Sequence, residues 1–254
     1  MTLESYIRAK KAEKHILLMT HVVLGYPSFE DCFRIIETMV HADVDLMELQ
    51  VPFSEPIADG PVILKANQAA LERGADITKC LEFAGEVARN FEVPLLVMSY
   101  YNILFKYGVK QFVSVMAEKG LRGAIVPDLP PEEAEEYLEA MNSKGLAPVF
   151  IFSPGTSKKR MEYIASHARG LIYCVARKGV TGAETTFSHE TSEYLARCRK
   201  ATSLPLAVGF GIKEKTDIEF LKGKADIAVI GTQTIRIMQG KGIRAVGAFI
   251  RKIR

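Results

Sequence analysis

Two carboxylates lie eleven residues apart in settings that differ. Glu48 lies inside the apolar run Asp45–Val51, which has the composition of a strand, whereas Asp59 lies in a proline-rich loop that ends Asp-Gly-Pro. Burying an ionised carboxylate in a strand that packs a core costs free energy, so such a group is either paired for structure or kept for chemistry. Burial also disfavours the charged form of a carboxyl, which suits a group that gives and takes a proton near neutral pH. We therefore expect Glu48 and Asp59 to be acid–base groups.

Each of these residues has a structural alternative. Glu48 could form a salt bridge with a basic residue of a neighbouring strand, although the apolar runs offer no Lys or Arg for it. Asp59 could simply form a turn before Gly60. His21, in the first apolar run, either reaches the site or packs in the core.

Glycines follow several later runs and indicate a phosphate site. Backbone N–H groups bind phosphate where glycine permits close approach and a helix begins. Gly211 follows the seventh run, Gly231-Thr232 follows the eighth, and Gly182 lies in the loop after the sixth. Thr232 could also serve as a helix N-cap. The alternative is that these glycines only permit tight turns.

Aromatic and apolar side chains are expected to lie beside the phosphate site, at the same end of the apolar runs. Beside a phosphate site they indicate a pocket for a flat apolar substrate with an anionic tail. The residues expected to line it are Leu24, Tyr100, Ile125, Tyr173, Thr181 and Phe210.

Eight strand-like runs alternate with helical segments along the whole chain. Such alternation implies parallel strands joined by crossover helices, and eight units in about 250 residues match a (β/α)8 TIM barrel. The expected strands are Ile16–Val23, Asp45–Val51, Pro94–Tyr101, Gly123–Asp128, Ala147–Ser153, Gly170–Ala176, Pro205–Gly211 and Ala225–Gly231.

An open doubly wound sheet is the alternative, but no dinucleotide-binding glycine motif follows the first run. Residues Leu3–Lys14 predict a helix before the first strand, and Thr232–Gln239 and Ile243–Ile253 predict helices after the eighth. With no linker-like stretch, residues 1–254 are expected to form a single barrel domain.

The composition excludes some functions. With 33 Lys and Arg against 30 Asp and Glu, the net charge of +3 is too small to favour nucleic acid or an anionic membrane. The four cysteines are widely spaced, so neither structural zinc nor a disulfide framework is expected. No apolar run is long enough to span a bilayer, and the first fifteen residues do not look like a signal peptide. We expect a cytoplasmic protein without a metal.

The sequence resembles the α subunit of tryptophan synthase from about Met19 to its C-terminus. The most specific block is Pro52-Phe-Ser-Glu-Pro-Ile-Ala-Asp-Gly-Pro61. The other blocks are Leu24–Pro27, Glu48–Val51, Val126–Pro130, Arg177–Glu184, Val208–Ile212 and Ile230–Thr232.

The resemblance implies a lyase of tryptophan biosynthesis that cleaves indole-3-glycerol phosphate to indole and glyceraldehyde 3-phosphate, by a retro-aldol step without Schiff base or metal. It makes Glu48 the main acid–base group, assigns Asp59 to the indole N–H, and places Tyr173 in the active site. It assigns phosphate binding to Gly182, Gly211, Gly231 and Thr232. It implies no cofactor in this chain and a β-subunit partner carrying pyridoxal phosphate in an α2β2 complex. Loops Pro52–Pro61 and Lys178–Glu190 would close over substrate.

Several residues depart from the family's usual pattern. Gln50 replaces a glycine and should share a face with Glu48, while His21 replaces an aromatic ring. Glu55 replaces an aspartate in the loop that meets the partner, and Ala176 replaces a serine. Two other functions remain open: a weakly active barrel that mainly activates its β-subunit partner, and another phosphate-binding barrel such as an isomerase.

Overall fold

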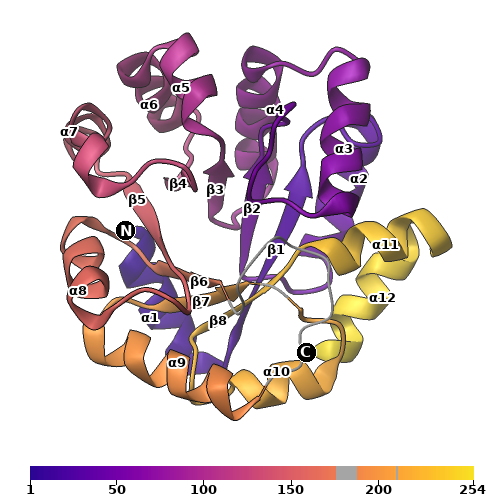
Figure 1. Ribbon diagram of the computed structural model, residues 1–254. Helices are drawn as coiled ribbons and strands as arrows, with labels where there is room; N and C mark the ends of the chain where they lie inside the picture. The colour runs from indigo at the N-terminus through magenta and orange to yellow at the C-terminus, as the bar shows by residue number, and fades with distance from the viewer. Residues whose placement is uncertain (176–187, 210) are drawn as a thin grey trace.

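Eight parallel strands form a closed barrel in which each strand pairs with the next and the eighth pairs with the first. The computed structural model describes residues 1–175, 188–209 and 211–254, and Figure 1 shows its helices arranged around the strands. The expected TIM barrel is confirmed. The strands are β1 (Leu17–Val23), β2 (Leu46–Gln50), β3 (Leu95–Met98), β4 (Gly123–Ile125), β5 (Ala147–Phe152), β6 (Ile172–Val175), β7 (Leu206–Gly209) and β8 (Ile227–Ile230).

Alternation along each strand sorts the side chains into two cores. Successive residues of a strand point to opposite faces, and both faces of a barrel are covered. In β2, Met47 and Leu49 pack outward against the helices, whereas Leu46 packs inside the barrel. Glu48 and Gln50 follow Leu46 at intervals of two, so they share its inward face. The interior apolar layer includes Leu17, Met19, Leu96, Met98, Ile125, Val149, Ala207 and Val229.

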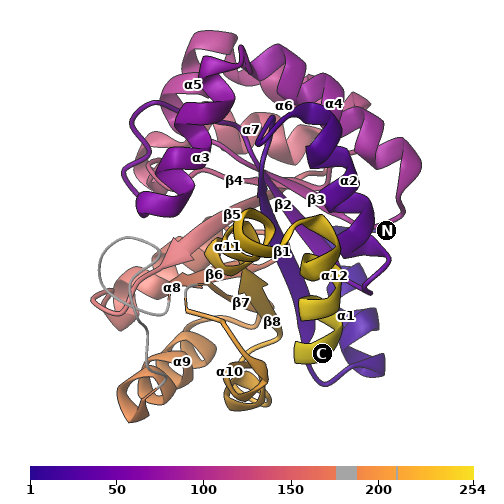
Figure 2. The same cartoon turned by 90° about the vertical axis from the view of Figure 1, so that its right-hand side faces the viewer.

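The helices cover the outside of the barrel, as the turned view in Figure 2 also shows. Several begin at side-chain caps, including Ser28, Asp76 and Ser157. The helices are α1 (Leu3–Glu13), α2 (Phe29–Val40), α3 (Pro61–Glu72), α4 (Ile77–Asn90), α5 (Tyr101–Tyr107), α6 (Val109–Glu118), α7 (Glu135–Ser143), α8 (Lys158–His167), α9 (His189–Ala201), α10 (Lys215–Leu221), α11 (Thr232–Lys241) and α12 (Ile243–Ile253), with a 3₁₀ turn at Pro131–Glu133.

The amino end of the barrel is closed by apolar packing and by ion pairs. Leu3 and Ile7 of α1 join the interior core and are buried. Just before β2, the buried carboxylate of Asp45 lies 2.6 Å from Lys14 Nζ and 3.0 Å from Arg254 Nη2. It also accepts a hydrogen bond from the backbone N–H of Leu18. These contacts tie both ends of the chain to the first two strands.

The third strand ends earlier than expected. It was expected to reach Tyr101, but β3 ends at Met98 and α5 begins at Tyr101, where its N–H donates to the side chain of Asp128. Gly108 ends this short helix with φ of 98°, a backbone conformation that favours glycine. The long segment before β3 divides into α3 and α4 near Gly74.

Candidate active site

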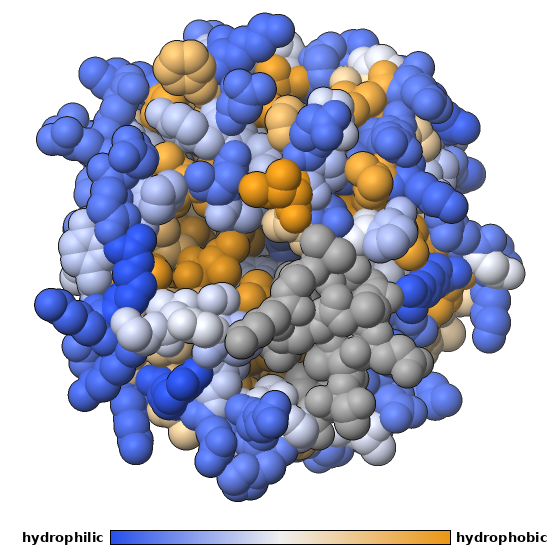
Figure 3. Space-filling model, viewed as in Figure 1, coloured by the Kyte–Doolittle hydropathy of each residue, from blue (hydrophilic) through white to orange (hydrophobic). Residues whose placement is uncertain are grey.

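A pocket opens where the carboxyl ends of the strands meet. It encloses about 870 Å³ of space, open mouth included, and is lined by residues of β1 to β6, of β8 and of the segments that follow the strands. Figure 3 shows the hollow in this face, with apolar side chains inside it and polar residues around it. In TIM barrels this end of the strands carries the active site.

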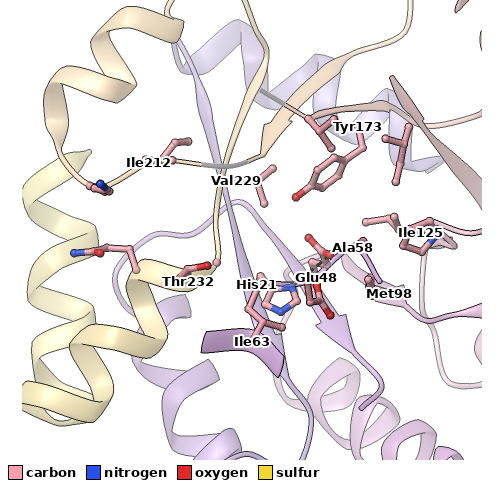
Figure 4. A pocket seen from close by; sticks show the side chains of 18 of the residues that line it. His21, Glu48, Ala58, Ile63, Met98, Ile125, Tyr173, Ile212, Val229 and Thr232 are labelled. Atoms are coloured by element: carbon pink, nitrogen blue, oxygen red, sulfur yellow. Dashed lines mark ion pairs between the residues drawn. The ribbon is translucent and has the colours of Figure 1, made fainter. Parts of the chain in front are cut away.

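His21 and Glu48 lie side by side on one side of this pocket (Figure 4). They are direct neighbours in the register of β1 and β2, and His21 Nδ1 lies 3.3 Å from Glu48 Oε1. Each side chain is only 6% exposed. Among the described residues, neither Glu48 Oε2 nor His21 Nε2 has a hydrogen-bond partner. The carboxylate is therefore held at one oxygen and bare at the other.

Asp59 lines the same pocket, and Gln50 holds its side chain by a hydrogen bond. The amide Nε2 of Gln50 donates to Asp59 Oδ2 at 2.6 Å, so Gln50 contacts Asp59 as well as sharing a face with Glu48. Asn67 of α3 accepts from the backbone N–H of Phe53 and orders the start of the intervening loop. Tyr100 accepts from the backbone N–H of Ala58 at 3.1 Å and fixes its end.

Burial and neighbouring charge shift the pKa values of this cluster. Burial raises the pKa of Asp59, although the hydrogen bond from Gln50 and the charge of His21 oppose that rise. Burial also raises the pKa of Tyr173 well above its ordinary value, with a further contribution from Glu48 and Asp59. Tyr173 is thus a neutral phenol at the pH of the cell. For His21, burial lowers the pKa, but the charge of Glu48, its hydrogen bond and the charge of Asp59 together raise it above the ordinary value of 6.5.

The part of the pocket wall around β7 and β8 is built from backbone. Gly209 ends β7 where a Cβ would overlap the ring and hydroxyl of Tyr173, so only glycine lets this ring lie against the strand. Gly211 has φ of 91°, which also favours glycine. Beyond Gly231, helix α11 begins, and its first N–H groups have no partner within the helix. Such a helix start attracts anions.

Thr232 does not cap this helix as the sequence suggested. It is the first helical residue, and Gly231 occupies the N-cap position without a side-chain hydrogen bond. The hydroxyl of Thr234 instead donates to the carbonyl of Gly231. The side chain of Thr232 lines the pocket, and in Figure 4 His21 lies between it and Glu48.

Most of the expected site residues meet in this one pocket. Tyr100 lies beneath the Asp59 loop and is buried. Leu24 was expected at the mouth but packs in the outer core between barrel and helices, because it faces away from the interior. Thr181, Gly182 and Phe210 lie outside the described residues. The expected residues that line the pocket are Glu48, Asp59, Ile125, Tyr173, Gly211, Gly231 and Thr232.

The sequence interpretation missed part of the pocket. It left the place of His21 open and did not name Lys213, Gln233 or Arg236, all of which line the pocket. Lys213 follows Gly211-Ile212, and Gln233 and Arg236 follow Thr232 on α11. These three residues could have been predicted to line the pocket, because they lie close in sequence to the glycines expected to bind phosphate. They add two cations to the neutral backbone donors.

The arrangement suits proton transfer to and from a flat ligand. Two carboxylates with different partners stand beside an apolar wall, and backbone donors and cations line the same pocket. Within residues 1–175, 188–209 and 211–254, no three His, Cys, Asp or Glu side chains gather in a way that could hold a metal ion. In the same ranges, no helix has both the length and the apolar character needed to cross a membrane.

Comparison with known proteins identifies one family. The family model described as "Tryptophan synthase alpha chain" matches residues 7–248. The tryptophan synthase alpha chain of Desulforapulum autotrophicum is 61% identical over 251 residues, covering 99% of each chain. That of Syntrophotalea carbinolica is 59% identical, covering 99% of this chain and all of the relative. Among solved structures, tryptophan synthase of Mycobacterium tuberculosis matches with a TM-score of 0.92 at 27% identity, covering 99% of this chain and 96% of that one. Tryptophan synthase subunit alpha of Legionella pneumophila matches with a TM-score of 0.90 at 28% identity, covering 100% and 97%.

Proposed function

Because the chain belongs to the tryptophan synthase alpha chain family, we propose that Glu48 is the acid–base group of this family's reaction. The chain is a lyase of tryptophan biosynthesis that cleaves indole-3-glycerol phosphate to indole and glyceraldehyde 3-phosphate. One observation carries the assignment of Glu48. Its carboxylate is buried in the pocket, yet Oε2 has no hydrogen-bond partner in the part of the chain that the structure describes. A buried polar atom without a partner costs free energy unless a ligand satisfies it.

Glu48 would act twice in one turnover. It first gives a proton to carbon 3 of the indole ring, which leaves positive charge at the ring nitrogen. It then takes the proton of the hydroxyl on the adjoining side-chain carbon, and the bond between this carbon and carbon 3 breaks. The electron pair returns to the ring, the aldehyde forms, and Glu48 ends with its proton restored.

The carboxylate of Asp59 would accept a hydrogen bond from the indole N–H while the ring nitrogen carries positive charge. A carboxylate opposite a developing cation stabilises the transition state more than the ground state. The amide of Gln50 donates to Oδ2 and holds the carboxylate of Asp59 in place. The apolar side chains of Ile125 and Val229 and the ring of Tyr173 line the pocket and supply the wall for the indole.

The phosphate would lie at the start of α11, with Gly211, Gly231 and Thr232 around it. The helix N-terminus and the nearby Lys213 and Arg236 favour a dianion there. Gly182 belongs to this proposal from the sequence alone, as do Thr181 and Phe210 for the indole.

The Thr232 hydroxyl can be tested with glycerol 3-phosphate, which stands in for the anionic half of the substrate. Thr232→Val keeps the shape of the side chain and removes its hydroxyl. The dissociation constant of glycerol 3-phosphate should be about tenfold or more higher for this variant, because a hydrogen bond to a charged group contributes roughly 1.5–3 kcal/mol. Thr232→Ser keeps the hydroxyl and serves as the matched control. Equal affinity in calorimetric titrations of all three proteins would place the phosphate elsewhere.

We also propose the wider setting of this reaction. The chain forms one barrel domain over residues 1–254, works in the cytoplasm, uses no cofactor of its own, and pairs with a β subunit that holds pyridoxal phosphate in an α2β2 complex. Ile57 in the Asp59 loop and Phe105 on α5 are 72% and 70% exposed. Such exposed apolar side chains support the proposal of a protein partner on this end of the barrel.

Glu48→Gln tests the assignment of the acid–base group. The amide keeps the size of the side chain but carries no exchangeable acid proton. The rate of indole release should fall by roughly 10²–10⁴-fold, the usual contribution of a single acid–base group. The measurement should be made with and without added β subunit, on protein shown to be folded by circular dichroism. A fall of less than about tenfold would refute the role of Glu48, and would favour a chain that mainly activates its partner.

A further inference from the structure

His21 contacts the carboxylate proposed to do the chemistry. Its inward orientation follows from β1, where Leu17 and Met19 also point into the barrel at intervals of two. The register of β1 against β2 then brings His21 level with Glu48, and Nδ1 comes within 3.3 Å of Oε1. The contact is therefore fixed by the sheet itself, not by a loop.

The contact with His21 gives the two carboxylate oxygens of Glu48 different surroundings. Oε1 faces the imidazole, whereas Oε2 is bare among the described residues and belongs to a side chain that lines the pocket. A donor on Nδ1 would hold the carboxyl plane in one orientation. Oε2 is then presented to a ligand in the pocket.

The charged and titratable groups around His21 favour its protonated form. Glu48 faces it from β2, Asp59 from the following loop, and both raise the pKa of the imidazole against the effect of burial. From β8, the neighbour of the ring is the backbone of Gly231, which carries no charge. Tyr26 lines a small cavity on another side of His21, and its hydroxyl accepts a hydrogen bond from Gln239.

Other titratable groups of the pocket act on this cluster from farther away. Tyr173 lines the same pocket from β6 and stays neutral. The cations that line the pocket, Lys213 and Arg236, come from the β7–α10 loop and from α11. Within the part of the chain that the structure describes, the basic side chain in ion-pair contact with Glu48 is that of His21.

We propose that His21 is a positioning residue for Glu48 and shares with it the proton used in catalysis, so that the two side chains act as one acid–base unit. The inference rests on the acid–base role proposed above for Glu48. The unit starts the turnover with one proton available for transfer. Glu48 delivers it to carbon 3 and regains one from the substrate hydroxyl, so the unit ends as it began and no other reactant is required.

A shared proton changes the pH dependence of cleavage. Two sites that share a proton hold it to a higher pH than either site alone, because each adds a bound state. Activity should therefore be lost on the alkaline side at a pH above 6.5, following the raised pKa of His21. Removing His21 leaves a carboxyl as the only carrier of the proton. Because the ordinary pKa of a carboxyl lies roughly two units below that of an imidazole, the alkaline limb should move to lower pH.

Single-turnover cleavage of indole-3-glycerol phosphate from pH 5 to 10 tests this for the complete chain. His21→Gln keeps a donor toward Oε1 but cannot carry the proton, and His21→Phe keeps neither. Both should move the alkaline limb down, and His21→Phe should lose more of the plateau rate because the carboxyl is no longer oriented. His41→Gln makes the same change at an exposed histidine and should leave the profile in place. An alkaline limb that stays at the same pH in both His21 variants would overturn the proposal.

The imidazole itself provides a readout that needs no activity. Carbon-13 and nitrogen-15 spectra of histidine-labelled protein, assigned by the signal missing in His21→Phe, should show His21 titrating above pH 6.5. In Glu48→Gln that midpoint should fall, because burial then acts without the carboxylate that opposes it most strongly. An unchanged midpoint would contradict the shared proton even if the His21 variants fold poorly. An active Glu48→Gln enzyme would instead refute the role of Glu48, so the two failures are distinguishable.

Discussion

Two carboxylates, one just before β2 and one in the middle of this strand, are both buried, yet their surroundings differ. Asp45, just before the strand, is 2% exposed and contacts Lys14, Arg254 and the backbone N–H of Leu18. Glu48, in the strand, is 6% exposed and lies 3.3 Å from a histidine. Asp45 has a partner at each oxygen, whereas Glu48 Oε2 has none among the residues that the structure describes.

The difference separates a structural from a functional charge. A buried carboxylate surrounded by cations and N–H donors is stabilised in its ionised form and has no capacity left for a substrate. A carboxylate with an unused oxygen in a pocket is a cost to stability that chemistry can justify. In a barrel this division follows the axis, since the amino end of the strands serves stability and the carboxyl end serves function.

Asp45→Asn should have the largest effect on stability. The amide can still accept from Leu18, but the two cations lose their charge partner. Lys14 and Arg254 are 25% and 20% exposed and can turn to water. The free energy of unfolding in urea should therefore fall by about 2–4 kcal/mol, somewhat less than the roughly 3–5 kcal/mol of a fully buried pair.

Asp43→Asn is the matched control for this prediction. Asp43 faces the same two cations, with Lys14 Nζ 3.0 Å and Arg254 Nε 2.6 Å from its carboxylate, but it is 65% exposed. Exposed pairs contribute about 0–1 kcal/mol, so this variant should lose no more than that. Equal losses for Asp43 and Asp45 would mean that burial does not distinguish the two carboxylates.

Gln50→Met should have a smaller effect, at the other end of the strand. The change keeps the buried volume and removes the amide that donates to Asp59 at 2.6 Å. Because that donor orients Asp59, the rate of cleavage should fall on the order of tenfold, the lower end for a hydrogen bond to a charged group. Gln68→Met, at an exposed position of α3, is the control. Unchanged kinetics in Gln50→Met would show that Asp59 needs no support from β2.

The barrel and the main site residues could be predicted from the sequence because each leaves a local pattern. Strand-like runs at regular spacing predict the parallel barrel, and the barrel in turn places Glu48 and Gly231-Thr232 at one mouth. Glu48 stands out because a carboxylate interrupts an apolar run. The glycines stand out because they follow the runs at their carboxyl ends.

The contacts between these residues could not be predicted because they depend on register. Neighbouring parallel strands can slide by two residues and keep the same faces inward, so the level of His21 against Glu48 is set only by the closed barrel. The donation from Gln50 to Asp59 depends on a loop of eight intervening residues, whose path is held by Asn67 and Tyr100 from elsewhere in the chain. The placement of Leu24 was wrong for the same reason, since one residue of offset exchanges the two faces.

The central claim is that Glu48 serves the chemistry whereas Asp45 serves stability. The most direct test is to measure the rate of indole release per folded molecule for Glu48→Gln and Asp45→Asn side by side. Glu48→Gln should be slower than the unmodified chain by roughly 100-fold or more. Asp45→Asn, although less stable, should release indole at the unmodified rate once the unfolded fraction is subtracted. Similar rates for the two variants would contradict the account, because Glu48 would then be no more involved in the chemistry than Asp45.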